Sequence, residues 1–339
     1  PQASISEANN SVMSFLSDLL SIIEPLGYAV PLLGYHPSHT PDTAPIMPKT
    51  RYDIMYSYMP KVGNRGREMM KLTSSLQVSV DFNSEKDALN KLNLANRAAP
   101  YFIAMSANSS VTQCEFAGVA SARARAWTDT DPARCGFPKF IFNSGQTFSD
   151  YVEWALDVPM YFVERQDRKI DMTKYTFRQF LAGAINEIKD TELPFATRDD
   201  WETHLSTLFP WARLRHYVEI RAFDMNSPDI NFELMLLIDR LFNNESILAN
   251  LHNFLGPPDQ ARTEALLNAA INFGLDGEDL REGSKKILSL AMHASPTEDF
   301  VALSSRINSW KFDENKKEVE RSYREYVNAR LLKAPRPGL

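Results

Sequence analysis

The strongest constraint on the fold is a change of pattern at Pro228. Beyond it, apolar residues recur at helical spacing over residues 231–255, 258–273, 278–294, 297–309 and 314–333, interrupted by GPP, GLDG and ASP. Periodic apolar stretches between glycine and proline breakers predict amphipathic helices. Before Pro228, helical stretches are mixed with stretches that alternate like strands. The sequence therefore predicts an α+β region over residues 1–228 and an all-helical region over residues 229–339 that packs on it.

Local patterns predict the elements of the first region. Ser74–Phe82 (SSLQVSVDF) alternates apolar and polar residues, which predicts a strand, and Ser84 caps a long helix that follows. Residues 110–127 predict a hairpin or strand pair around Cys114, and residues 213–224 predict one further strand. The remaining expected elements are helices at 5–26, 51–59, 176–185 and 199–209, and a helix followed by a strand over 147–163.

Charge and composition exclude several classes of protein. The 339 residues carry a formal net charge of −6, so the basic excess of a nucleic-acid-binding protein is missing. No run of 18 apolar residues is present, and we expect no membrane-spanning segment. The two cysteines are too few for a disulfide framework and indicate a reducing compartment. With no basic and apolar leader at the start, we expect a cytoplasmic location.

Two segments concentrate basic residues. Residues 47–73 hold three arginines and three lysines around Gly63 and Gly66, and residues 121–136 (SARARAWTDTDPARCG) hold three arginines, two aspartates and a tryptophan. Arginines bind carboxylate and phosphate through paired hydrogen bonds, and glycines beside them allow an anion cradle. The alternatives are a solvated basic face for the first segment and an internal Arg–Asp network for the second. The spacing alone does not decide between them.

The segment YVEIRAFD holds the clearest candidate pair. Glu219 and Arg221 are two residues apart on a predicted strand, so both point to the same face. They either pair with each other or bind a metal and a phosphate. His204 and His216 lack the spacing of metal ligands, and we interpret them as packing or hydrogen-bonding residues.

Six motifs occur in an order that resembles glutamate–cysteine ligases of the plant and proteobacterial type. They are RYDIMYSYMPKVGNRGREMM, QVSVDFNSE, ARAWTDTDPARCG, YVEWALDVPMYFV, TFRQFLAG and DWETHLSTLFPWARLRHYVEIRAFD. The resemblance implies a fold similar to glutamine synthetase, with a curved, mostly antiparallel sheet. It also implies that ATP phosphorylates the γ-carboxylate of glutamate and that the amine of cysteine then attacks. This is the first step of glutathione synthesis, with ATP and Mg²⁺ as cofactors.

The resemblance also assigns roles to individual residues. Arg123, supported by Arg134, is expected to hold the α-carboxylate of glutamate, with Trp127, Thr73 and Met70 as further substrate-binding residues. Lys49 and Arg51 are expected to meet phosphate oxygens and Arg221 to stabilise the transferring phosphate. Glu219 and Gln77 are the expected Mg²⁺ ligands. Cys114 and Cys135 match a region where plant members of the family form a redox-sensitive disulfide, and two unbridged cysteines remain the equal alternative.

The sequence departs from the family at three points. Ser79 replaces an asparagine, Phe223 replaces a small residue, and the family's main metal carboxylates belong to a stretch expected before Pro1. Mg²⁺ prefers six oxygen ligands, which Glu219 and Gln77 cannot supply. Three alternatives stay open: a piece of a complete ligase, one half of an enzyme whose missing strands belong to a separate chain, or a catalytically inactive relative. We expect no activity from these 339 residues without that stretch.

Overall fold

The computed structural model describes residues 4–166, 168–185, 195–277, 279–293 and 297–312, together with Arg321. Its helices are α1 Ile5–Ile23, α2 Thr50–Tyr58, α3 Gly66–Leu72, α4 Glu85–Ser106, α5 Ala122–Thr128, α6 Phe148–Asp157, α7 Phe177–Leu181, α8 Arg198–Ser206, α9 Pro228–Phe242, α10 Glu245–Leu255, α11 Gln260–Phe273, α12 Leu280–Met292 and α13 Val301–Ser309. Its strands are β1 Ser75–Val80, β2 Val111–Thr112, β3 Glu115–Phe116, β4 Cys135–Gly136, β5 Phe162–Arg165, β6 Arg168–Asp171, β7 Phe209–Pro210, β8 Ala212–Leu214 and β9 Val218–Asp224. The fold class is α+β, as predicted.

The central sheet is antiparallel and has the strand order β1–β9–β8. The register places Ser79 opposite Glu219 on one side and Arg213 opposite Glu219 on the other. The pairing of β1 with β9 shifts between Leu76 and Val78, next to Gln77. Three polar or charged positions of different strands are thereby aligned across the sheet.

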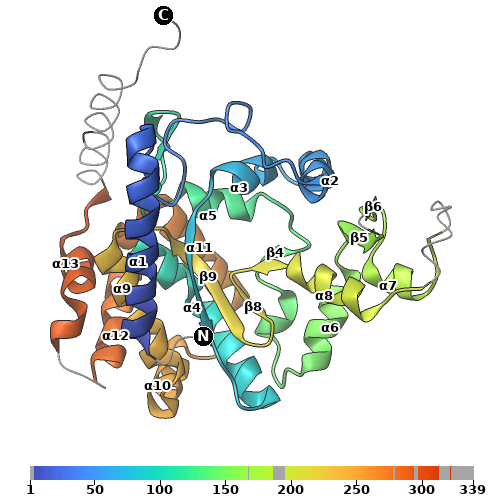
Figure 1. Cartoon of the computed structure of the whole chain (residues 1–339). Helices are drawn as coiled ribbons and strands as arrows, with labels where there is room; N and C mark the ends of the chain where they lie inside the picture. Colours follow the sequence, from blue (N-terminus) through green and yellow to red (C-terminus); the bar gives the residue numbers. More distant parts are fainter. Residues whose placement is uncertain are drawn as a thin grey trace, which may run out of the picture.

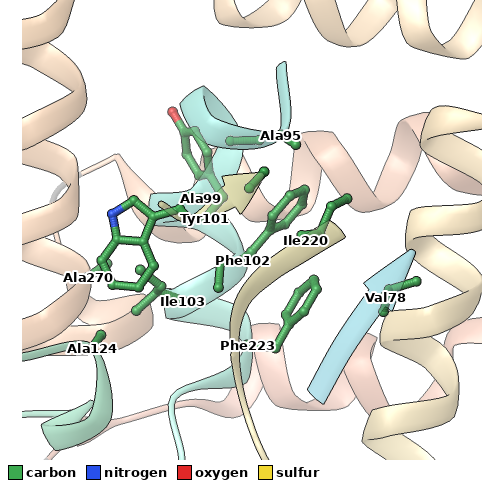
Figure 2. Packing of buried hydrophobic residues seen from close by; sticks show 14 of the residues in the cluster. Val78, Ala95, Ala99, Tyr101, Phe102, Ile103, Ala124, Ile220, Phe223 and Ala270 are labelled. Carbon is green, nitrogen blue, oxygen red and sulfur yellow. The ribbon is translucent and has the colours of Figure 1, made fainter. Parts of the chain in front are cut away.

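Helix α4 is the centre of the hydrophobic core. It contacts β9 and β8 of the sheet and also α10, α11 and α12 of the helical region (Figure 1). Figure 2 shows Phe102 of α4 beside Ile220 and Phe223 of β9, and the ring centroids of Phe102 and Phe223 are 5.2 Å apart. The amide of Asn96, also on α4, exchanges two hydrogen bonds with the backbone of Ala212, at 2.9 and 3.1 Å. These contacts fix the sheet against the helices.

Side-chain caps explain where several helices begin. The Ser84 hydroxyl accepts a hydrogen bond from the backbone N–H of Asp87 and starts α4, as the sequence predicts. Thr147 with Asp150 and Thr197 with Asp200 form capping boxes at α6 and α8. A capping box satisfies backbone N–H groups that would otherwise have no partner inside the helix. Among the described helices, none is both long and apolar enough to cross a bilayer.

Several predicted elements differ from the structure. Residues 213–224 form two strands, because the chain turns at Arg215, whose N–H donates to the carbonyl of Tyr217. The helix predicted over 231–255 is two helices, because Asn244 caps a new one with its side chain. The predicted strand pair over 110–127 is a short hairpin over Val111–Phe116 followed by helix α5. The helix predicted over 314–333 lies outside the described residues, Arg321 excepted.

Candidate active site

The candidate site lies on the central strand of the sheet. Every residue of β9 is buried, and Glu219 and Arg221 have exposed fractions of 8% and 7%. Oε2 of Glu219 accepts hydrogen bonds from Nη1 of Arg221 at 2.6 Å and from Nε of Arg213 at 2.7 Å. Nη1 of Arg221 also donates to the side-chain oxygen of Gln77 at 3.3 Å. The structure therefore brings together Gln77, Glu219 and Arg221, and it adds Arg213.

The electrostatics of this cluster favour an anion. Burial favours a raised pKa for Glu219, but the hydrogen bonds and charges of Arg213 and Arg221 outweigh burial and lower it. The carboxylate is therefore ionised at neutral pH, and the three side chains together carry one net positive charge. The hydrogen bonds of Arg221 to side chains of the described residues come from Nη1, and none involves Nε or Nη2. They remain available to a negatively charged ligand.

Two aromatic rings flank the guanidinium group of Arg221. Its central carbon lies 5.5 Å from the ring centroid of Trp127 and 5.6 Å from that of Phe209. The two rings meet edge to face at 5.5 Å. Aromatic faces attract a cation and restrict its orientation. Trp127 therefore lies next to the cluster, and its substrate-binding role remains a prediction.

Arg123 lies behind the sheet strand rather than on an open surface. Its exposed fraction is 1%, and its guanidinium group donates to the backbone carbonyls of Arg221 at 2.6 Å and Ala222 at 3.2 Å. Asp224 lies 3.9 Å away and accepts a shorter bond, of 2.6 Å, from Ser109. Burial lowers the pKa of Arg123 to about 10. In this structure Arg123 supports β9 from inside, and its predicted contact with glutamate remains untested.

Arg134 takes part in an internal network. It is fully buried, with Nε donating to Asp131 at 2.6 Å and Nη2 donating to the carbonyl of Pro159 at 2.6 Å. Its guanidinium group lies 3.8 Å from the ring centroid of Tyr161. The internal Arg–Asp alternative is therefore confirmed for this pair. It fails for Asp129, which accepts hydrogen bonds from the backbone and side-chain nitrogens of Asn64.

The basic segment over 47–73 does not join the cluster. Lys49 and Arg51 are exposed at the start of α2, and Arg51 donates to the hydroxyl of the neighbouring Tyr52. Within the described part of the chain, no hydrogen bond or ion pair connects them to Glu219 or Arg221. Their predicted role toward phosphate remains untested.

The glycines of this segment serve close packing. A Cβ atom on Gly63 would lie 2.4 Å from the carbonyl oxygen of Thr130, and one on Gly66 would lie 2.5 Å from Cβ of Met59. Such distances exclude any side chain without movement of the neighbours. Close packing thus explains these two glycines, and their interpretation as part of an anion cradle remains a prediction.

Thr73 directly follows the last residue of α3, and Met70 lies near the end of this helix. The hydroxyl of Thr73 donates to the carbonyl of Met69 at 2.7 Å, and the half-buried Met70 packs on the core. The hydroxyl is thus engaged with the backbone of its own helix. The expected substrate contacts of both residues remain predictions.

The residues of the site do not fit Mg²⁺ by themselves. Among the described residues, no group of three or more His, Cys, Asp or Glu side chains is placed to hold a metal ion. Glu219 is the one carboxylate of the cluster, and two guanidinium groups already bond to its Oε2. A cation would have to compete with both positive charges and would still lack most of an octahedral oxygen shell. We therefore assign no step to a metal held by Glu219 and Gln77.

The two cysteines are thiols in this structure and no disulfide joins them. Cys114 is exposed in the turn of the β2–β3 hairpin, and Cys135 lies on β4. Burial, followed by the charge of Asp131, raises the pKa of Cys135 to about 12. His204 is buried, and its Nε2 lies 2.8 Å from the carbonyl oxygen of Ala155, which confirms its interpretation as a hydrogen-bonding residue.

Arg213 and Phe209 are the residues of the cluster that sequence analysis missed. Arg213 reaches Glu219 because a turn at 215–217 folds β8 back on β9. RLRHYVEI contains no Gly, Pro, Asn or Asp that would indicate such a turn. The short spacing between Arg213 and Glu219 was thus the one available signal.

The fold and site define an α+β protein with an arginine-clamped carboxylate on the central strand of an antiparallel sheet. Residues 1–289 match the family model described as "Glutamate-cysteine ligase family 2", and the chain belongs to this family. It is 42% identical over 224 residues to a chloroplastic glutamate–cysteine ligase of Arabidopsis thaliana, which covers 66% of this chain and 42% of the relative. A chloroplastic glutamate–cysteine ligase of Medicago truncatula is also 42% identical, covering 66% of this chain and 44% of the relative.

A third relative is the chloroplastic glutamate–cysteine ligase A of Oryza sativa subsp. japonica, 40% identical over 66% of this chain and 45% of the relative. The chain thus spans less than half the length of these curated relatives. The predicted cytoplasmic location is wrong by this comparison, because the relatives are named as chloroplastic proteins, which points to a plastid.

Proposed function

We propose that the native protein carrying this sequence joins the γ-carboxylate of glutamate to the amine of cysteine at the expense of ATP. A γ-carboxylate oxygen attacks the terminal phosphorus of ATP, and the bond to ADP breaks. The cysteine amine then attacks the acyl phosphate carbon, loses a proton and expels phosphate. The products are γ-glutamylcysteine, ADP and phosphate, and the reaction is the first step of glutathione synthesis.

The observation that carries the proposal is the state of Arg221. It is nine-tenths buried, is held on one side by Glu219 and Gln77, and keeps Nε and Nη2 for an anion. Phosphoryl transfer is catalysed mainly by positioning and by neutralising charge on the transferring group. A fixed arginine between Trp127 and Phe209 supplies both without reorganising when the charge develops. Family membership supports glutamate and cysteine as the substrates.

The proposal also includes the fold of the catalytic region, the place of Mg²⁺ and the roles of the remaining candidate residues. The antiparallel order β1–β9–β8 supports a glutamine-synthetase-like curved sheet, with residues 1–228 as the catalytic region and residues 229–339 packed on it. Mg²⁺ would accompany ATP, with most of its carboxylate ligands supplied by residues outside the described ones, in this chain or in a separate one. Arg123, Arg134, Trp127, Thr73 and Met70 remain candidates for the substrate side, and Lys49 and Arg51 for the phosphate side.

A second candidate function is that of a catalytically inactive relative or one half of a split enzyme that binds glutamate or a partner chain. Its support is that Arg213 and Arg221 both bond to Oε2 of Glu219, the carboxylate of the cluster, which opposes metal binding there. The two functions differ in turnover, because both retain an anion-binding Arg221 but only the ligase releases ADP.

The test is an assay of ADP release by the native protein with ATP, Mg²⁺, glutamate and cysteine, and mass spectrometry of the product. We expect release to require both amino acids and Arg221→Gln to lower kcat by about 100-fold or more. Arg198→Gln is the matched control, because Arg198 is exposed and, within the part of the chain that the structure describes, its ion pair is with Glu202 in the next turn of its helix. ADP release that ignores cysteine, or an Arg221→Gln variant as active as the control, would contradict the ligase.

A further inference from the structure

Arg213 links three elements around the site. From β8, its Nε donates to Glu219 on β9 at 2.7 Å. Its Nη1 donates to the backbone carbonyls of Ser206 at 2.9 Å and Leu208 at 3.0 Å, at the end of α8 and just beyond it. The side chain has an exposed fraction of 11%. Arg213 therefore connects the end of α8 to the Glu219 carboxylate, which is also the hydrogen-bond acceptor for Arg221.

The sharing of one carboxylate oxygen makes the two arginines interdependent. Oε2 of Glu219 is the acceptor for both, so the direction in which Arg213 holds this oxygen sets where Nη1 of Arg221 lies. The second bond of Arg221, to Gln77, is longer at 3.3 Å and comes from an exposed side chain on an edge strand. Gln77 alone is thus a weaker restraint on the guanidinium group.

We propose that Arg213 is a positioning residue that fixes Arg221 for an anion by holding Glu219, and that Glu219 acts as their common anchor. This inference rests on the proposed function for the identity of the anion, a phosphoryl group, and on the structure for the positioning. Nε and Nη1 of Arg213 are bonded to protein groups, and these bonds hold Glu219 and the end of α8. The contribution of Arg213 is to hold Nη1 of Arg221 against Glu219, which leaves Nε and Nη2 for the anion.

The shape of the Arg213 guanidinium group, and not its charge alone, positions Arg221. A lysine at position 213 would keep the positive charge. It lacks the planar fork that reaches a carboxylate and two carbonyls at once. If Arg213 acted only through its charge, lysine would replace it fully and any nearby cation would matter equally. Arg215, two residues further on, provides the nearby cation for this comparison. The hydrogen bond that closes the turn comes from the backbone N–H of Arg215, so replacing its guanidinium group leaves this bond in place.

The experiment compares wild type with Arg213→Lys, Arg213→Gln and Arg215→Gln in the full chain. The first readout is the affinity for inorganic phosphate by titration calorimetry. The second is the ¹⁵N–¹H signal of the Arg221 guanidinium group in arginine-labelled protein, assigned by its loss in Arg221→Lys. We expect both Arg213 variants to bind phosphate about 10-fold more weakly and to broaden or shift the Arg221 signal. Arg215→Gln should change neither readout by more than about a quarter of that effect.

Three results would overturn the inference. They are wild-type phosphate affinity in Arg213→Lys, an unchanged Arg221 signal in both Arg213 variants, and no phosphate binding by wild type. Failure of the proposed function has a different signature. In that case the Arg213 variants show the expected losses while wild type makes no γ-glutamylcysteine, and the positioning of Arg221 still stands.

Discussion

Protonation of His204 should destabilise the protein between about pH 6.5 and pH 4. The ring is 2% exposed, Nε2 bonds to the carbonyl oxygen of Ala155 at 2.8 Å, and Nδ1 has no partner among the described residues. Nε2 therefore carries the proton of the neutral ring, and a second proton on Nδ1 would be buried without an acceptor. Burial lowers the pKa of His204 from 6.5 to about 4.

The sign and size of the change in unfolding free energy follow from the linkage between proton binding and folding. Between the two pKa values the unfolded chain binds a proton that the folded protein does not, so the free energy of unfolding falls as the pH falls. The full difference between the two pKa values corresponds to about 3 kcal/mol of unfolding free energy, of which about 2 kcal/mol is lost by pH 5. The pKa values of Asp200 and Glu219 are lowered from their ordinary values, so both carboxylates stay ionised between pH 7 and pH 5. Because His204 lies on α8 and carbonyls at the end of this helix hold Arg213, we expect the same protonation to disturb the site.

The assay is urea unfolding at pH 7, 6 and 5 for wild type, His204→Gln and His216→Gln. His204→Gln should be less stable than wild type at pH 7, through lost packing against Phe177 and Trp201, but should lose about 2 kcal/mol less on going to pH 5. His216 is exposed, and its variant should follow the wild-type slope. Equal slopes for wild type and His204→Gln would refute the reasoning.

Three further variants or reactions test other parts of the account. Gly63→Ala should lower the unfolding free energy by about 1–3 kcal/mol in urea titrations, since its Cβ would meet the Thr130 carbonyl oxygen; wild-type stability would contradict this close approach. Arg123→Ala should lower it by about 3 kcal/mol, because two carbonyls of β9 lose a donor and the buried Asp224 carboxylate loses a nearby positive charge. Loss of glutamate affinity with unchanged stability would instead favour the substrate role. Iodoacetamide at pH 8 should label the exposed Cys114 and spare Cys135, whose raised pKa leaves about one thiolate in 10⁴, and peptide mass spectrometry showing equal labelling would count against this.

Elements with local signals were predictable from the sequence. Alternation in SSLQVSVDF marks β1, and Ser84 marks the start of α4, because strand periodicity and helix capping are properties of neighbouring residues. The shared face of Glu219 and Arg221 follows from the two-residue period of a strand. The break between α9 and α10 also has a local signal, because Asn244 is a strong capping residue, although the apolar pattern continues across it.

Side-chain contacts between residues that are distant in the sequence could not be predicted. An arginine satisfies its donors equally well with carboxylates, phosphates or backbone carbonyls, so ARARAWTDTDPAR could not reveal that Arg123 bonds to β9. The clamp on Glu219 depends on a turn at 215–217 that lacks the usual turn residues. The glycines at 63 and 66 are explained by close packing against Thr130 and Met59, which only the tertiary structure shows.

The most direct test of the account follows oxygen from glutamate to phosphate. The native protein is supplied with ATP, Mg²⁺, cysteine and glutamate labelled with ¹⁸O in the γ-carboxylate, and the released phosphate is analysed by mass spectrometry. Ligation through an acyl phosphate transfers one labelled oxygen to each phosphate, and Arg221→Gln should reduce the amount of labelled phosphate in proportion to kcat. Phosphate released without ¹⁸O would show that water, not glutamate, receives the phosphoryl group, and would contradict the assignment of this site to ligation.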